Sequence, residues 1–290
     1  MDNRSGPRST APQRRNFTHR QTRHWPQIVV PAVCLLLPWA VLLVLSLGVG
    51  WQYPSMFPET LNLLPWRMLL TQRQLLLSSL MTSLVISLTV AVLATLAGLL
   101  ISRILRQVQS AIPAFLVFLP WVMSPVVAAV CLYDLFIRLG LAGTLTGVLL
   151  AQTLFATSFA AIFFMDLWTH RTDREESLIR ALGGGTWRVW QHVVLPNCRP
   201  LLPVCLVQTG LFSWLDYGLV SMIGGGHVST LTLRLFALIR EASIHQAALA
   251  SLLLTLPTLL AVVFLFLRDR LTAFPLVDSP TEPTFAKELP

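Results

Sequence analysis

Three aspartates interrupt otherwise apolar stretches of the sequence and are the first candidates for chemistry: Asp134, Asp166 and Asp216. A carboxylate inside a membrane is costly, so such a residue is a functional candidate by default. Asp216 stands between Trp214 and Tyr217, where it could line a solute pathway or bond, buried, to a neighbouring helix. Asp134 could also line a pathway, or pair with Arg138 one helical turn on. The candidate pathway residues are therefore Asp216, Asp134 and Tyr217.

The remaining polar residues form no catalytic pattern. His170 and His192 lack metal-ligand spacing, and no Ser/His/Asp arrangement is evident. The four cysteines have no CxxC spacing and mostly lie in apolar runs, which is typical of small buried hydrophobic residues. The glycine runs at 183–185 and 224–227 lack the lysine and the preceding strand of a phosphate-binding loop. We therefore expect no catalytic residue, no metal and no ATP site in this chain, which is not predicted to be an enzyme.

The stretch EESLIRALGGGTWRVWQHVVLP, residues 175–196, is a polar island between apolar runs. A helix is predicted to begin after Thr172, which opens a capping box. Glycines 183–185 should end this helix, because glycine readily adopts the left-handed conformation found after helix ends. Thr186 can cap a second helix, and Pro196 should end it. The stretch therefore predicts a helix, a sharp turn and a second helix.

The second predicted helix has an apolar face that carries Trp187, Trp190 and Val194. Two interpretations compete. The tryptophans could rest among lipid headgroups, or the element could dock into a groove on a soluble partner. An exposed apolar face on a bent, structured loop favours docking.

The composition predicts that these residues belong to a membrane protein. The 290 residues are 54% hydrophobic and only 12% charged, whereas a soluble domain carries about twice that charge. A helix needs about 20 apolar residues to cross a bilayer. We therefore expect an all-α membrane protein with six transmembrane helices. The predicted spans cover about residues 28–49, 76–101, 112–136, 144–166, 201–223 and 246–267.

The arginines predict the orientation of these spans. A cytoplasmic N-terminus places sixteen of the 21 Lys and Arg residues on the cytoplasmic side, as the positive-inside rule requires. Both termini and the segment 170–200 are then cytoplasmic. The predicted organisation is a disordered basic tail over 1–26, a transmembrane domain over 27–268 and a second tail over 269–290. The net charge of +8 is thus explained by topology and a lipid bilayer, not by a nucleic-acid partner.

The polar island resembles the EAA loop of ABC-importer permease subunits, the binding-protein-dependent type. That pattern has Glu-Ala-Ala, a glycine, nine residues, an aliphatic residue, any residue and then Leu-Pro. Gly183 followed by Val193, Leu195 and Pro196 reproduces the spacing, and the Glu-Ala-Ala positions hold residues 177–179 instead, with Glu176 one residue early. The docking residues that the resemblance implies are Glu176, Arg180, Gly183, Trp187, Val193, Leu195 and Pro196.

The resemblance covers roughly residues 70–268. LPWVMSPVVAAV (119–130) and GLAGTLTGVLLAQ (140–152) look like the third and fourth core helices of the type I permease fold. The family implies a second permease subunit, either the same chain or a paralogue, and a cytoplasmic ATPase dimer that uses ATP and receives the loop. It also implies an extracytoplasmic substrate-binding protein and a bacterial inner-membrane location.

Two other functions remain open at this point. A self-sufficient secondary transporter should show inverted repeats and midplane ion ligands, and none is clear. A non-transporting scaffold would not need proline-rich core helices or a bent docking loop. Residues 222–233 resemble the sequences of permeases for polyamines, ferric iron, thiamine or phosphonates. The sequence does not favour one of these cargoes over the others.

Overall fold

The computed structural model describes residues 25–49, 60–61, 66, 75–108 and 110–272. The chain divides into two compact units, residues 1–41 and 42–290, and the boundary falls within α1 (Trp25–Leu47). The predicted tails over 1–26 and 269–290 lie almost wholly outside the described residues. The described secondary structure is helical apart from one antiparallel pairing of two short strands, β1 (Gly48–Val49) with β2 (Thr60–Leu61).

Among the described residues, three helices are long and apolar enough to cross a membrane. They are α3 (Leu75–Val108), α6 (Leu145–Met165) and α13 (Ile244–Thr272). These helices confirm the predicted positions of the second, fourth and sixth spans, and α6 matches its predicted bounds to within one residue. The predicted number of six spans is not confirmed.

The third predicted span is not one straight helix. It consists of α4 (Ala111–Val122) and α5 (Pro125–Arg138), and the chain bends by 111° between them. If the two helices are counted as one span, the described residues contain four candidate spans. Ser124 lies at the break with an extended backbone (ψ 136°). A residue before proline is disfavoured in the helical region, so Pro125 explains why the helix stops there and starts again in a new direction.

The fifth predicted span is also broken. It consists of α10 (Leu202–Leu215) and α11 (Gly218–Ile223), and Asp216 at the break has an extended backbone (ψ 127°). The carboxylate of Asp216 accepts hydrogen bonds from the amides of Leu219 and Val220 at 3.4 and 3.3 Å. It thereby satisfies the free N–H groups that open α11, as capping residues do.

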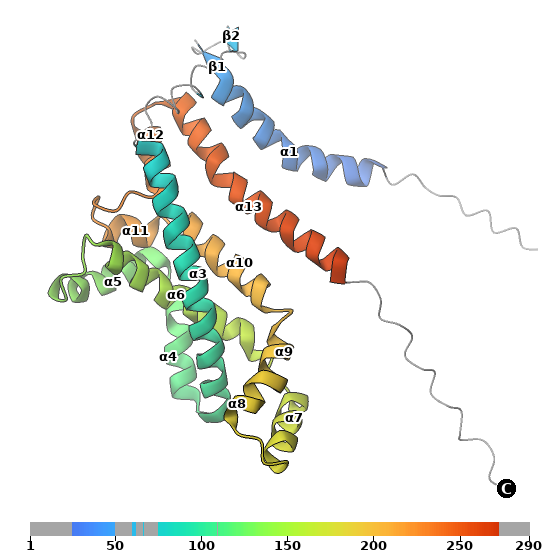
Figure 1. The fold of residues 1–290 in the computed structure, drawn as a ribbon. Helices are drawn as coiled ribbons and strands as arrows, with labels where there is room; N and C mark the ends of the chain where they lie inside the picture. The colour runs from blue at the N-terminus through green and yellow to red at the C-terminus, as the bar shows by residue number, and fades with distance from the viewer. Residues whose placement is uncertain (1–24, 50–59, 62–65, 67–74, 109, 273–290) are drawn as a thin grey trace, which may run out of the picture. The chain divides into compact units, whose positions relative to one another are not determined.

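The segment after α11 contains a helix that the sequence did not predict. It is α12 (Leu231–Arg240), which begins after Thr230 and packs against α3 and α13. Ser83 on α3 accepts a hydrogen bond from the amide of Leu231 at 2.7 Å, and Ser79 bonds to Ser229 at 2.9 Å. These contacts place the start of α12 beside the first turns of α3 (Figure 1).

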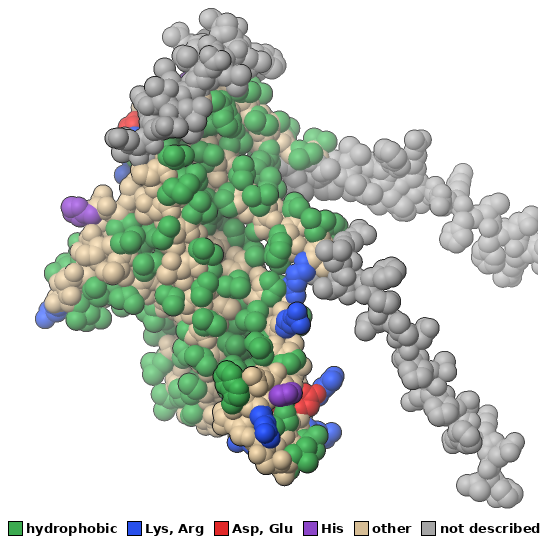
Figure 2. Space-filling model, in the orientation of Figure 1, with side chains coloured by type: hydrophobic (Ala, Val, Ile, Leu, Met, Phe, Trp, Pro, Cys, Tyr) green, Lys and Arg blue, Asp and Glu red, His purple; other side chains and the backbone are tan. Residues whose placement is uncertain are grey.

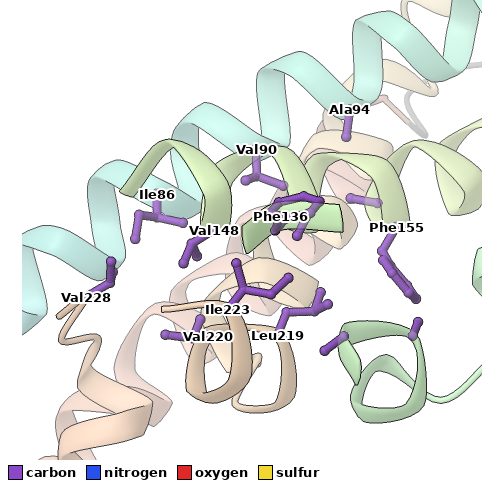
Figure 3. Packing of buried hydrophobic residues seen from close by; sticks show 14 residues of the cluster. Ile86, Val90, Ala94, Phe136, Val148, Phe155, Leu219, Val220, Ile223 and Val228 are labelled. Carbon is purple, nitrogen blue, oxygen red and sulfur yellow. The ribbon is translucent and has the colours of Figure 1, made fainter. Parts of the chain in front are cut away.

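Helix α3 is the centre of the second unit and packs against both α6 and α10. A Cβ atom added at Gly98 would lie 2.4 Å from the Cβ of Ala160, so the backbones of α3 and α6 approach too closely for any larger residue. Nearer the start of α3, Ile86 and Val90 are buried against residues of α6 and α11 (Figure 3). This core fixes where the two ends of α3 lie.

Candidate docking segment and its anchor on α3

The polar island folds as a helix, a turn and a second helical run at the end of α3 opposite α12 (Figure 1). The first helix is α7 (His170–Ala181), which starts after Thr169 and so begins earlier than predicted. Thr172 lies inside α7, and its hydroxyl donates to the carbonyl of Leu167 at 2.9 Å, so it does not form the predicted capping box. Thr186 does not cap the second run either, because Gly185 occupies the N-cap position.

The turn after α7 confirms the role predicted for the glycines. Gly183 has a φ of +79°, in the left-handed region that side chains disfavour. The amide of Gly184 donates to the carbonyl of Ile179 at 2.9 Å, and that of Gly183 donates to Arg180 at 3.0 Å. These two bonds form a Schellman motif, which satisfies carbonyls at the end of α7.

The second run does not end at Pro196 as predicted. It consists of α8 (Thr186–Val189), a π-helical turn (Trp190–Val194) and α9 (Leu195–Cys198). Proline has no N–H and crowds the preceding turn of an α-helix. The wider π-turn immediately before Pro196 accommodates this defect, so the helical run continues for two more residues.

The second run does not expose the whole of its predicted apolar face. Trp187 is 72% exposed, whereas Val193 and Val194 are buried, and Val194 belongs to a cluster with residues of α3 and α6. The predicted face of Trp187, Trp190 and Val194 is therefore not a single exposed surface. Val193, expected at the docking surface, packs within the chain instead. We call the exposed apolar side chains of this region the docking face: Leu178, Leu182, Trp187 and Leu195.

The segment is attached to α3 through Arg103, which is only 8% exposed. Its Nη2 atom lies 3.1 Å from Oε2 of Glu176. Its guanidinium lies 5.7 Å from the ring centroid of Trp168 and 4.9 Å from that of Trp190. The flat cation suits this position, since arginine stacks on aromatic faces while it donates hydrogen bonds in its own plane.

A second ion pair continues the attachment one turn along α3. Nη2 of Arg106 lies 3.0 Å from Oδ2 of Asp173. The two arginines are three residues apart on α3, and their carboxylate partners are three residues apart on α7. The partners follow in the opposite order, so the facing turns of the two helices run antiparallel. Nε1 of Trp168 donates to the hydroxyl of Ser102 at 2.9 Å and adds a third link.

The other charges of α7 are more open to solvent. Arg180 lies 3.6 Å from Glu176 and its side chain is 57% exposed. Glu175 accepts hydrogen bonds from Arg171 at 2.9 Å and from Asn197 at 3.3 Å. These two bonds lower the pKa of Glu175 below its usual value, so the carboxylate stays ionised at neutral pH.

The three predicted pathway residues each bond to a different partner within the chain. Asp216 is 9% exposed and accepts a hydrogen bond from Nε2 of Gln152 on α6 at 2.9 Å, which confirms the buried, hydrogen-bonded alternative. Asp134 pairs with Arg138 at 2.8 Å, as the helical spacing suggested. Tyr217 accepts a hydrogen bond from Arg240 on α12 at 3.1 Å.

The role of Arg103 was not predicted from the sequence, where its charge served only to orient the spans. A signal was present in the spacing. Two basic residues, Arg103 and Arg106, are three residues apart, and two acidic residues, Asp173 and Glu176, have the same spacing. Such a match cannot be recognised until the fold shows that the two segments are neighbours.

The described fold defines an all-α protein with several helices suited to a membrane, and one comparison with curated proteins agrees. The chain is similar to the protein named "Sulfate permease 2, chloroplastic" from Chlamydomonas reinhardtii, with 28% identity over 167 residues. The match covers 52% of this chain and 44% of that protein, so this chain spans less than half of that protein's length. No family model matches the chain.

Proposed function

We propose that this chain is the transmembrane permease subunit of an ATP-driven importer of the ABC type. In this proposal the chain forms part of the substrate pathway, and α7–α9 lie on the cytoplasmic side. A separate dimeric ATPase hydrolyses the ATP and receives the docking face. A second permease subunit and an extracytoplasmic binding protein complete the importer, and a bacterial inner membrane is its expected location.

The observation that carries the proposal is the docking face on a helical segment. Leu178, Leu182 and Trp187 are each more than 60% exposed, although they belong to an ordered, charge-rich part of the chain. Figure 2 shows several charged side chains gathered at this lower end and a mostly hydrophobic surface above it. Large apolar side chains among charges are typical of surfaces that bind another protein, and a helix in a groove is one common mode.

The similarity to a sulfate permease supports transport as the function and adds an oxyanion to the possible cargoes. The earlier candidates were polyamines, ferric iron, thiamine and phosphonates. A free carboxylate at Asp216 would have favoured a cation, but this carboxylate is buried and bonded to Gln152. We therefore infer no preference for a cationic cargo from Asp216.

The test is purification of the tagged chain from its native cell in mild detergent. Every co-purifying chain is identified by mass spectrometry, and ATP hydrolysis is assayed with and without vanadate. We expect an ATPase subunit with vanadate-sensitive hydrolysis, together with the second permease. A chain that purifies without an ATPase in several detergents would contradict the proposal and favour a secondary transporter or a scaffold.

A further inference from the structure

We propose that Glu176 is a positioning residue, which holds the docking face on the end of α3 through Arg103 and does not itself contact the ATPase. This inference rests on the proposed function for the identity of the partner. The attachment of α7 to α3 is a property of this chain alone, so it can be measured without that partner.

The accessibility of Glu176 is the first argument. Its side chain is only 16% exposed, whereas the four side chains of the docking face are all more than half exposed. Its carboxylate already has two cationic neighbours, Arg103 at 3.1 Å and Arg180 at 3.6 Å. A partner protein would have to displace one of them to bind Glu176.

Of the two cationic neighbours of Glu176, Arg103 is the one that a partner protein could not easily displace. Arg103 is buried, and its guanidinium lies over the indole rings of Trp168 and Trp190. Its buried Nη1 atom has no hydrogen-bond partner, and among the described residues the salt bridge of this guanidinium is the one to Glu176. Removal of one partner from a buried ion pair leaves an uncompensated charge, which is strongly destabilising.

The register of the attachment explains what Glu176 positions. The pairs Arg103–Glu176 and Arg106–Asp173 hold one turn of α7 against one turn of α3. The docking face begins at Leu178, only two residues beyond Glu176. Because α3 is continuous from Leu75 to Val108, the same helix that carries Arg103 also contacts Ser229 and Leu231 near the start of α12. The ion pair therefore fixes the docking face to the central helix of the unit.

The experiment compares hydrogen exchange of α7 amides in the detergent-solubilised chain without ATPase. The variants are Glu176→Gln, Arg103→Met and the double variant, and Arg174→Gln on the exposed side of α7 is the matched control. We expect the exchange rate of the α7 amides to rise roughly tenfold in each single variant. Without the ion pair, local opening of α7 costs less free energy. The double variant should add no more than about twofold, since both changes remove one interaction.

Arg103→Lys keeps the charge but loses the planar stack, so its exchange should lie between that of the wild type and that of Arg103→Met. This variant and the near-isosteric Glu176→Gln keep the test valid if Arg103→Met fails to fold. Unchanged α7 exchange in Glu176→Gln, with reduced ATPase capture, would overturn the proposal in favour of a direct contact. A wild-type chain that captures no ATPase would overturn the proposed function, and the exchange data would still decide whether Glu176 holds α7 on α3.

Discussion

Nε2 of Gln152 donates to the carboxylate of Asp216 at 2.9 Å, and this bond joins the break between α10 and α11 to the middle of α6. The amide oxygen of Gln152 in turn accepts from the hydroxyl of Ser213 at 2.7 Å. A polar network thus replaces the backbone bonds that are lost where the fifth predicted span is interrupted. Its members satisfy one another, which is what allows polar groups to remain buried.

Asp216→Ala should destabilise the fold by about 2–3 kcal/mol, because it leaves Nε2 of Gln152 and the first amides of α11 without their acceptor. Asp216→Asn keeps one carbonyl oxygen and should cost less. The measurement is unfolding of the purified chain in mixed micelles with increasing denaturing detergent. Asp134→Ala breaks an ion pair whose side chains are both 75% exposed, and it should cost no more than about 1 kcal/mol. Equal losses for Asp216→Ala and Asp134→Ala would contradict the importance of the buried network.

Gly183→Val should destabilise the turn between α7 and α8 by at least about 1–2 kcal/mol, since a side chain is unfavourable at a φ of +79°. Gly185→Ala is the matched control. Gly185 has an ordinary φ of −74° and open space around it, so the change should be within about 0.5 kcal/mol of neutral. Hydrogen exchange of the α7 and α8 amides measures both. In the proposed importer, Gly183→Val should also uncouple ATP hydrolysis from transport while the chain still inserts into the membrane.

Trp187→Ala and Leu182→Ala should each weaken capture of the ATPase roughly thirtyfold or more, because central apolar side chains dominate the energy of such interfaces. The measurement is titration of the purified chain with the ATPase subunit identified by co-purification. Ile239→Ala on α12 removes a side chain of similar exposure at the other end of α3 and should leave capture unchanged. If all three variants bind equally well, the docking face has been assigned to the wrong surface.

Cys198 should resist thiol labelling in the folded chain. It is fully buried, and burial raises its pKa to about 12, so the reactive thiolate is scarce at neutral pH. A chain with Cys198 as its sole cysteine should be labelled by maleimide only after unfolding. Leu195→Cys in a cysteine-free background provides the comparison, since position 195 is 54% exposed on the same helix and should react rapidly. Similar labelling rates at the two positions would show that α9 does not pack as described.

The sequence by itself determined the features that depend on local composition. A long apolar run with a suitable start predicts a helix wherever it lies, so α6 was located to within one residue and α3 and α13 were recognised. The turn at Gly183 was also predictable, because a left-handed residue favours glycine whatever surrounds it. These properties belong to the chain before it folds.

The tertiary structure alone decided which residues meet. Hydrophobicity does not distinguish a straight span from two helices at 111°, and the residue at the second break, Asp216, accepts a hydrogen bond from Gln152, 64 residues away. Val193 is buried on the same side of the helical run as Val189, four residues earlier, and only the packed fold shows which side faces inward. Arg103 became the anchor of the docking segment only because folding buried it against two tryptophans and beside Glu176. Burial makes such a pairing obligatory, and burial is a property of the packed fold that no single stretch of sequence specifies.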